Sequence, residues 1–383
     1  MRHFTTLRQF GASVRSILIL ALVLTSASAT GIEARQTSAT MAFPGEGWEA
    51  VPRAGLAAYG WSTEGLQATQ AFLRDSANST GVVVVDRGRV VFEFGDTQEL
   101  SYLASVRKSI LAMLYGDHVL DGTIDLQATL LDLNLDDIGG LLEVERHARI
   151  QDLITARSGV YHPASNGGDN LADAPPRGSQ EPGSFMLYNN WDFNAAGAVF
   201  EQLTGRNIYD EVERQLAEPL RFEDWDREAQ RKSGDLTISR NPAYHMWIST
   251  RDMARIGHLM LNRGNWEGEQ VIPRAWADAI VSVVTPLEEM NPIPRRDGYF
   301  GYGYMWWVWD GPNATGPFEG AYTARGAIGQ WITVLPAVDL VIAHKTNSVY
   351  ERTTSWESWH RMLELILEAR GIGMERYPWS PRG

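Results

Sequence analysis

Predicted strands lie near both ends of this chain, and a long helical region separates them. Residues 82–85 and 90–94, rich in valine and aromatic residues, flank a short turn with glycine and predict an early hairpin. Further strands are predicted late in the chain, over 302–309, 331–335 and 340–344. This order predicts an α+β fold, in which helices flank an antiparallel sheet and an all-helical lobe is inserted into the chain.

Helical spacing of hydrophobic residues fills the middle of the sequence and recurs near its ends. The predicted helices cover residues 62–77, 105–115, 141–156, 191–203, 208–216, 250–263 and 354–370. We expect one domain over residues 49–383, with an α/β lobe at about 49–118 and 246–383 and a helical lobe at about 119–245. A polar loop rich in glycine and proline, at about 163–184, interrupts the helical lobe, and loops of that length are usually functional or mobile.

Residues 1–29 have the three parts of a secretory signal peptide. Three arginines make a basic start, residues 16–24 are apolar, and a small-x-small cleavage sequence ends at Ala29. The apolar run is shorter than the roughly 20 residues that span a membrane, so we expect no stable membrane insertion after cleavage. The expectation is an exported protein, periplasmic or secreted, in which residues 30–48 form a tether. A retained N-terminal anchor is the alternative.

Composition excludes several kinds of site. The chain has no cysteine, which rules out disulfides, thiolate nucleophiles and cysteine metal ligands. Its eight histidines are scattered and form no His-x-His or His-Glu-x-x-His motif, so we expect no metal and no other cofactor. A net charge of −13 disfavours nucleic-acid partners and leaves a small-molecule substrate as the expected partner. The sequence does not predict the oligomeric state.

Ser105 and Lys108 make the only Ser-x-x-Lys pair in a chain with three lysines and thirty-one arginines. Three residues apart on a helix, the two side chains share a face and can touch. A desolvated lysine can lose its proton, whereas an arginine cannot, so Lys108 could act as the base toward a Ser105 nucleophile. A solvated lysine near the start of a helix is the alternative interpretation.

Two further segments could complete such a site. Tyr188 and Asn190 precede a predicted helix and could supply a phenol for proton transfer and an amide. Residues 324–330 carry glycines before a predicted strand, where a ligand can approach the backbone closely. A free N–H there, together with that of Ser105, would form an oxyanion hole. Taken alone, each segment also fits a structural role, as a packed tyrosine with a capping asparagine or as a turn.

These three elements, in this order, resemble the β-lactamase-related serine hydrolase superfamily, which includes class C β-lactamases and penicillin-binding proteins. The Tyr-x-Asn form of the middle element is similar to the class C branch. Further matching segments are 156–163, 219–220, 249–255 and 329–330. Over about residues 50–370 the chain most resembles the subgroup of 6-aminohexanoate-dimer hydrolase-like and esterase-like proteins. This resemblance implies a β-lactamase/transpeptidase-like fold.

The resemblance also implies a role for each matching residue. Ser105 corresponds to the acylated nucleophile, and Lys108 corresponds to the base that takes its proton. Tyr188 corresponds to the phenol that passes a proton to the leaving group, and Asn190 to the amide that orients the lysine and the substrate. The backbone N–H groups of Ser105 and Ala327 correspond to the oxyanion hole.

One position departs from the family pattern. The family's β-lactamases carry lysine, and its peptidases often histidine, where this chain has Ala324. Because neighbours on a strand point to opposite faces, Arg325 is expected not to replace that cation, and activity on β-lactams is expected to be weak. One face of the aromatic segment 299–309 could line the substrate pocket. The weaker candidates for substrate binding are Tyr161, His162, Arg325 and Gly326.

The main hypothesis is therefore a serine hydrolase that cleaves small esters or amides through an acyl-enzyme at Ser105. One alternative is a class C-type β-lactamase or a hydrolase of D-Ala peptides. An alternative of another class is a non-catalytic, penicillin-binding-like sensor or binding protein, which stays acylated or binds without reacting. The sequence does not single out the physiological substrate or the group that activates water for deacylation.

Overall fold

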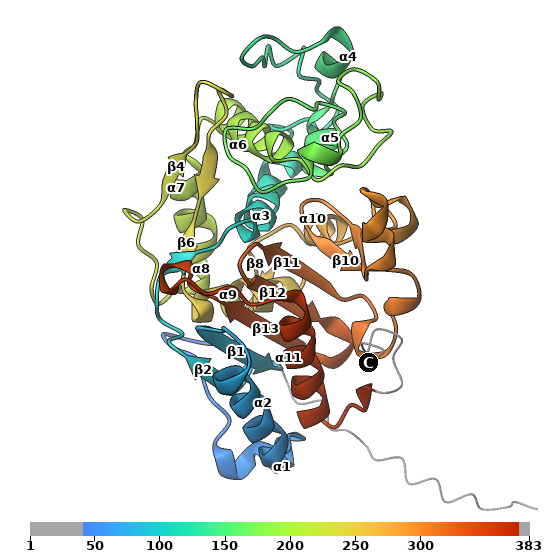
Figure 1. The fold of residues 1–383 in the computed structure, drawn as a ribbon. Helices are drawn as coiled ribbons and strands as arrows, with labels where there is room; N and C mark the ends of the chain where they lie inside the picture. The colour runs from blue at the N-terminus through green and yellow to red at the C-terminus, as the bar shows by residue number, and fades with distance from the viewer. Residues whose placement is uncertain (1–40, 375–383) are drawn as a thin grey trace, which may run out of the picture. The chain divides into compact units, whose positions relative to one another are not determined.

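The computed structural model describes residues 41–374, and the predicted signal peptide at 1–29 lies outside this range. The predicted α+β arrangement is confirmed by a seven-stranded antiparallel sheet in the order β2-β1-β13-β12-β11-β10-β9 (Figure 1). Its first two strands and its last five come from opposite ends of the chain, as the sequence predicts. The strands are β1 Gly81–Asp86, β2 Arg89–Gly95, β9 Phe300–Tyr302, β10 Trp307–Trp309, β11 Tyr322–Gly326, β12 Gln330–Leu335 and β13 Leu340–Lys345.

The remaining elements are short strand pairs and helices. The three two-stranded pairs join β3 Ser101–Tyr102 to β6 Trp247–Ile248, β4 Arg231–Ser233 to β5 Ala243–His245, and β7 Asn265–Trp266 to β8 Glu269–Gln270. The longer α-helices are α2 Thr63–Asp75, α3 Val106–Leu120, α6 Asn190–Thr204, α9 Thr250–Leu261 and α11 Trp356–Ala369. The shorter ones are α1 Leu56–Tyr59, α4 Glu143–Arg146, α5 Ile150–Ile154, α7 Ile208–Val212, α8 Glu218–Leu220 and α10 Arg274–Ile280.

Helices cover both faces of the large sheet. On one face, α9 lies so close that Gly257 has no room for a Cβ beside Ile332 and Val341. On the other face, Trp359 of α11 packs on Trp331, with ring centroids 5.4 Å apart. Since Trp331 and Ile332 are neighbours on β12, their side chains point to opposite faces of the sheet. Helix α2 lies beside α11 in Figure 1, on the same side of the sheet.

Helix α3 is the buried centre of the molecule. It packs against β11 and β12 of the sheet and against α6, α7 and α10. Two hydrogen bonds fix its axis, one from Tyr115 Oη to the carbonyl of Ala196 at 2.7 Å, the other from Trp276 Nε1 to the carbonyl of Ala112 at 2.7 Å. The first turn of α3 therefore has a well-defined position between the sheet and the helices.

Two predicted elements are wrong in detail. The single helix predicted over 141–156 is two short helices, α4 and α5, separated by a segment that bridges to the chain near Thr129. The single strand predicted over 302–309 is a hairpin of β9 and β10. The chain turns between them because Met305 has a φ of 59° and because Gly303 lies against the carbonyl of Ile280, where a Cβ would be 2.5 Å away.

The predicted tether extends too far toward the C-terminus. Within residues 41–48, the Ala42 N–H donates to the carbonyl of Arg87 at 3.0 Å. The Phe43 ring packs 5.1 Å from the ring of His258, and Trp48 Nε1 donates to the carbonyl of Arg251 at 3.1 Å. These aromatic side chains gain buried contacts on the domain, so residues 41–48 belong to it.

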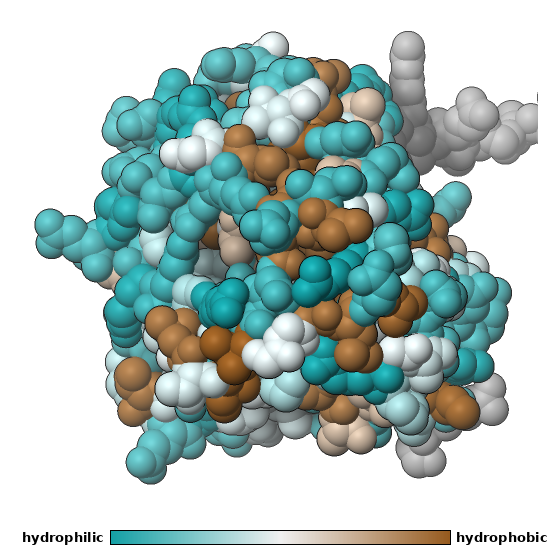
Figure 2. Space-filling view, turned by 90° about the horizontal axis from the view of Figure 1, so that it is seen from above, coloured by the Kyte–Doolittle hydropathy of each residue, from teal (hydrophilic) through white to brown (hydrophobic). Residues whose placement is uncertain are grey.

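Polar residues dominate the face of the molecule that Figure 2 shows. In the view of Figure 2, hydrophobic residues form separate patches surrounded by hydrophilic ones. Across residues 41–374, no helix has the length and apolar character needed to cross a membrane.

Lys345, at the end of β13, ties the large sheet to the strand pair of β3 and β6. Its ammonium donates to the carbonyls of Ser101 and Ile248, at 2.6 and 2.5 Å. Burial lowers the pKa of Lys345 to about 7. An unfolded lysine has a pKa of about 10.4, so the folded protein binds fewer protons than the unfolded one between these two values. The burial of the charged ammonium therefore lowers the free energy of unfolding most below pH 7, and this destabilisation decreases as pH rises.

We expect the free energy of unfolding of the wild type to rise relative to that of Lys345→Met between pH 6 and pH 9. The expected relative gain is on the order of 2 kcal/mol. Urea denaturation of both proteins at the two pH values measures it. Parallel pH dependences of the two proteins would show that Lys345 does not titrate in this range.

Candidate active site

Ser105 stands at the N-terminus of α3, as predicted. It occupies the N-cap position, yet its hydroxyl makes no capping hydrogen bond, so Oγ is not engaged by the helix. The residue before it, Ala104, has a φ of 49°, which turns the chain sharply into the helix. Backbone N–H groups of the first helical turn point toward Ser105 and favour negative charge beside it.

Lys108 lies one turn along α3 and is in contact with two of the predicted partners. Its Nζ is 2.6 Å from Tyr188 Oη and 2.6 Å from Asn190 Oδ1. The same atom lies 4.2 Å from the ring centroids of Tyr188 and Phe193. Only 1% of Lys108 is exposed, so the solvated-lysine interpretation of the Ser-x-x-Lys pair is wrong.

The surroundings of Lys108 favour its neutral form. Burial is the largest effect that holds the pKa of Lys108 well below its usual value, and the nearby guanidinium of Arg107 adds to it. The carboxylates of Asp169 and Asp192 act in the opposite direction and do not reverse the shift. A lysine in such a place can accept a proton at neutral pH.

Tyr188 is held in a mixed environment. Burial raises the pKa of the phenol, whereas a hydrogen bond with Ser105 acts to lower it. The guanidiniums of Arg107, Arg295 and Arg325 also act to lower the pKa of Tyr188. The phenol hydrogen-bonds with Lys108 and lies near enough to the Ser105 hydroxyl for that group to affect its pKa, which suits it to carry a proton between the two.

The long loop at 163–184 builds one wall of this site, a role that could not be assigned to particular residues from the sequence. Asn190 Nδ2 donates to the carbonyl of Gly167 at 2.8 Å, and the Asn190 N–H donates to Asp169 Oδ2 at 2.8 Å. The Asn170 N–H donates to the carbonyl of Tyr188 at 2.9 Å. The loop therefore fixes the residues that contact Lys108.

Gly326 allows the end of β11 to lie directly against the start of α3. A Cβ at this position would be 2.5 Å from the carbonyl oxygen of Leu103 and 3.1 Å from the backbone nitrogen of Ser105. Only glycine fits so close an approach. The next residue, Ala327, is exposed and lines the same cavity as Ser105, so both predicted oxyanion-hole residues border one space.

Ser105 and Tyr188 open into a cavity of about 220 Å³. Of the predicted residues, Arg325, Gly326 and Ala327 also line it. The other lining residues are Gly168, Arg295, Trp307, Ile328, Gly329, Trp331, Thr354 and Trp356. Among these, Ile328 and Gly329 belong to the segment 324–330 and Trp307 to the segment 299–309, both of which the sequence indicates as parts of the site.

The prediction that Arg325 does not supply a cation to the site is wrong. The prediction that the side chains of Ala324 and Arg325 point to opposite faces of the strand is correct. Ala324 pairs with Ile332 and is fully buried in the core, whereas Arg325 pairs with Trp331 and lines the cavity. The register of β11 therefore places a cation in the cavity at Arg325, on the face opposite to that of Ala324.

Two weaker candidates are not brought to the cavity. The ring nitrogens of His162 lie 2.8 Å from the carbonyl oxygen of Pro163 and 2.7 Å from that of Ile138, so this side chain ties two loops together. Tyr161 is buried, and its hydroxyl has no hydrogen-bond partner among the described residues. Neither residue is among those that line the cavity.

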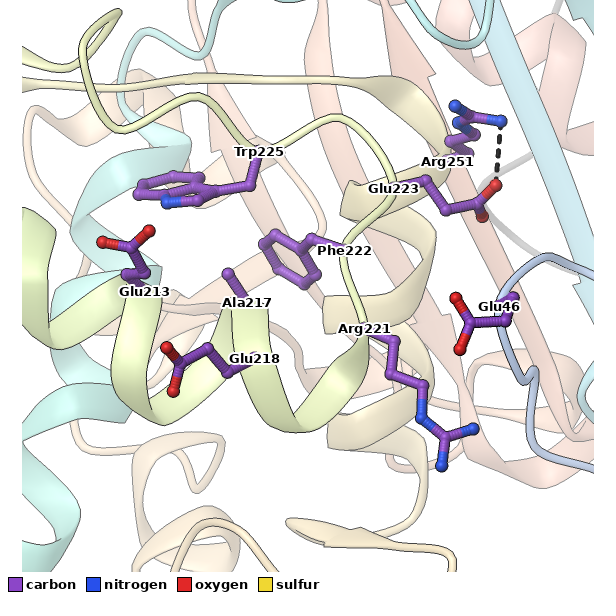
Figure 3. Close-up of a pocket in the computed structure, with 9 residues that line it drawn as sticks. All are labelled: Glu46, Glu213, Ala217, Glu218, Arg221, Phe222, Glu223, Trp225 and Arg251. Atoms are coloured by element: carbon purple, nitrogen blue, oxygen red, sulfur yellow. Dashed lines mark ion pairs between the residues drawn. The ribbon is translucent and has the colours of Figure 1, made fainter.

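A larger cavity of about 550 Å³ lies elsewhere, between the α7–α8 region, the start of α9 and Glu46 (Figure 3). Its lining is rich in carboxylates, and Glu223 forms an ion pair with Arg251 at 2.8 Å. No serine, tyrosine or lysine lines it. Size therefore does not identify the site, whereas the chemistry of the smaller cavity does. Within residues 41–374, no group of three histidine, cysteine or acidic side chains is arranged to hold a metal ion.

Comparison with known proteins gives a family match and a set of similar folds. The sequence model of the family named Beta-lactamase matches residues 67–364. An uncharacterised protein of Alkalihalophilus pseudofirmus is 27% identical over 109 residues, which are 27% of this chain. That match spans only 31% of the relative's own length.

Three solved structures illustrate the likeness of fold. A Bacillus anthracis protein assigned as a 6-aminohexanoate-dimer hydrolase is 21% identical, with a TM-score of 0.57 over 80% of this chain and 82% of its own. A family VIII carboxylesterase is 13% identical, with a TM-score of 0.58 over 80% of this chain and 97% of its own. A class C β-lactamase mutant is 13% identical, with a TM-score of 0.58 over 79% and 97%. These likenesses confirm the β-lactamase/transpeptidase-like fold.

Proposed function

This chain belongs to the β-lactamase family, a family of serine hydrolases, and from that premise we propose that it hydrolyses small esters or amides through an acyl-enzyme at Ser105. One observation carries the proposal. The Nζ atom of Lys108, shifted toward its neutral form, lies 2.6 Å from both Tyr188 Oη and Asn190 Oδ1, behind the cavity that Ser105 lines. This arrangement serves a serine nucleophile and requires no second base such as histidine.

In the proposed first step, Ser105 Oγ attacks the substrate carbonyl carbon and its proton passes to Lys108, directly or through Tyr188. The negative charge that develops on the carbonyl oxygen is stabilised by the backbone N–H groups of Ser105 and Ala327. When the bond to the leaving group breaks, Tyr188 gives the leaving oxygen or nitrogen a proton and is reprotonated by Lys108. The product of this step is an ester of Ser105.

In the second step, a water molecule attacks the acyl-enzyme and gives up a proton to the Tyr188–Lys108 pair. The ester bond to Ser105 breaks, the acid is released, and Ser105 Oγ recovers its proton. The described residues place no separate carboxylate in the cavity lining, so the same phenol and lysine serve both steps.

An esterase or amidase is favoured over a β-lactamase by one feature of β11. The position at which the family's β-lactamases carry lysine is the fully buried Ala324, so the cation that β11 does present to the cavity is a guanidinium one residue later, at Arg325. We also propose that the protein is exported, because its first 29 residues have the pattern of a signal peptide.

The test compares the wild type with Ser105→Ala on p-nitrophenyl acetate and on a chromogenic cephalosporin. We expect ester hydrolysis that depends on Ser105 and little turnover of the cephalosporin. Ser76→Ala, at an exposed position directly after α2 and outside the cavity lining, is the control serine and should keep the activity. Faster turnover of the cephalosporin than of the ester would favour the β-lactamase alternative.

Intact mass spectrometry separates an enzyme from a sensor. An adduct on Ser105 that forms and disappears indicates turnover. An adduct that persists after the substrate is removed would favour the sensor alternative, and the absence of both adduct and turnover would contradict the proposed chemistry.

A further inference from the structure

Two arginines from different parts of the chain meet in the catalytic cavity. Arg295 comes from the short 3₁₀ helix Ile293–Asp297, and Arg325 comes from β11. Their guanidinium carbons lie 5.2 and 5.5 Å from the ring centroid of Trp307, and that of Arg325 lies 4.4 Å from Trp356. Both arginines also line an adjoining hollow of about 140 Å³, so they stand where two spaces meet.

Neither guanidinium is paired with a carboxylate among residues 41–374. The guanidinium of Arg295 makes one hydrogen bond, from Nη2 to the amide oxygen of Asn170 at 2.6 Å, and its buried Nε has no partner among these residues. The guanidinium of Arg325, on the strand that pairs with β12, makes no hydrogen bond and no ion pair with any described residue. By contrast, Arg251 and Arg263 each form an ion pair with a carboxylate. Leaving two cations unpaired in a half-buried place costs free energy, and a bound anion would offset that cost.

The charges around the pair leave it strongly positive. Burial lowers the pKa of Arg325 to about 10, and repulsion from Arg295 contributes, yet Arg325 stays charged at neutral pH. Burial also lowers the pKa of Arg295, against the opposing effects of Tyr188, Tyr302 and Asp173. His360, beside Arg325, has its pKa lowered to about 4 by burial and by Arg325, so it adds no charge at neutral pH.

We propose that the substrate carries a carboxylate on its leaving group and that Arg295 and Arg325 bind this carboxylate together. The proposal rests on the proposed hydrolytic function and narrows its substrate class. A guanidinium presents parallel N–H donors that match the two oxygens of a carboxylate, and aromatic stacking holds the donor plane in place. The small cavity suits a compact anionic ester or amide.

The position of the pair assigns the carboxylate to the leaving group. Arg295 lies 6.0 Å from the ring of Tyr188, the phenol that gives the leaving atom its proton. Both guanidinium carbons and the Tyr188 ring lie beside the ring of Trp307, at 5.2, 5.5 and 5.4 Å from its centroid, so the two arginines are on the Tyr188 side of the cavity. The acyl part of the substrate would lie away from this side, toward the N–H groups of Ser105 and Ala327.

Two matched ester pairs test the assignment. 4-Acetoxybenzoate and 4-acetoxybenzamide differ only in charge on the leaving group, and phenyl hydrogen glutarate and its terminal amide differ only in charge on the acyl group. After normalisation to each ester's alkaline hydrolysis, we expect kcat/KM to favour the first acid over its amide by about 10- to 100-fold. A preference confined to the acyl-side acid, or no preference for either acid, would overturn the proposal.

Substitutions of the two arginines test whether they cause the preference for the acid over the amide. In Arg295→Met and Arg325→Met, the ratio of acid to amide should fall toward one. Arg231→Met is the matched control, because Arg231 is exposed and stacks on Trp247, with its guanidinium carbon 3.8 Å from the ring centroid, outside the catalytic cavity. This control should keep the wild-type ratio, and an unchanged ratio in both methionine variants of the pair would contradict the proposal.

A binding measurement needs no turnover, so it tests the carboxylate site separately from the proposed hydrolysis. Calorimetry with Ser105→Ala compares the binding of 4-hydroxybenzoate with that of 4-hydroxybenzamide. These are the phenols that hydrolysis of the first ester pair releases. We expect the acid to bind about tenfold tighter and the difference to disappear in the double variant Ser105→Ala/Arg325→Met. Absence of Ser105-dependent hydrolysis would refute the reaction alone, whereas equal binding of acid and amide would refute the anion site alone.

Discussion

Replacement of Lys108 by arginine is expected to lower kcat/KM for ester hydrolysis by at least about 10³-fold, although the positive charge is kept. The reason is that arginine cannot lose its proton in a protein and so cannot act as a base. Lys108→Met should be equally inactive, since it removes the base without adding a larger cation. Circular dichroism and thermal melting of both variants would show that the fold is retained. Activity of Lys108→Arg within tenfold of the wild type would refute the role of Lys108.

The pH dependence of the wild type gives a second measurement of the same role. Because burial and Arg107 hold the pKa of Lys108 well below its usual value, the neutral base forms as pH rises through that lowered pKa. We expect kcat/KM to rise with pH along this limb and to level off while a free lysine would still be charged. Lys232→Arg, an exposed lysine that pairs with Glu201, is the control and should keep the wild-type profile.

The catalytic elements could be predicted from the sequence because their chemistry is local. Ser105 and Lys108 are three residues apart, so helical geometry alone puts them on one face. Tyr188 and Asn190 are two residues apart at the start of a helix, and resemblance to a known family supplied their relation to Lys108. The sheet was predictable for a similar reason, since its valine-rich strands lie near the two ends of the chain.

The pair of arginines that we propose binds the substrate carboxylate could not be predicted, because the two residues come from distant segments of the chain. Arg295 lies in a proline-rich stretch with no motif, and it reaches the cavity only through the packing of the Ile293–Asp297 turn near Trp307. Arg325 was visible in the sequence, but its side of the strand was not, because the family's reference position, Ala324, points into the core here. One residue of register decides which of two neighbours faces a site.

The loop residues that hold Asn190 were hidden for the same reason. Glycine, asparagine and aspartate in a long loop predict turns, and they do not predict which backbone groups will be their partners. Asp169 and Gly167 contact Asn190 across 21 and 23 positions of sequence, through hydrogen bonds that only the folded loop creates. The sequence marks such a loop as functional, whereas the three-dimensional contacts identify what it positions.

Replacement of Tyr188 by phenylalanine is expected to produce a loss that depends on the leaving group. The substitution removes the hydroxyl that hydrogen-bonds with Lys108 and keeps the ring, whose centroid packs 5.4 Å from that of Trp307 and 4.9 Å from that of Phe193. For amides and alkyl esters, which leave as strong bases and need a proton, kcat/KM should fall by about 10²- to 10⁴-fold. For p-nitrophenyl acetate the loss should be much smaller, because p-nitrophenolate leaves without a proton.

The comparison separates proton transfer from simple loss of structure. Tyr209→Phe removes another buried hydroxyl, one that has no hydrogen-bond partner among the described residues, and it should leave all substrates at wild-type rates. An equal loss for p-nitrophenyl and alkyl esters in Tyr188→Phe would mean that the phenol mainly holds Lys108 in place. A loss that grows with the basicity of the leaving group would mean that the phenol delivers the proton. In that case the two arginines beside Tyr188 also tune the acid that protonates the leaving group, since both act to lower the pKa of the phenol.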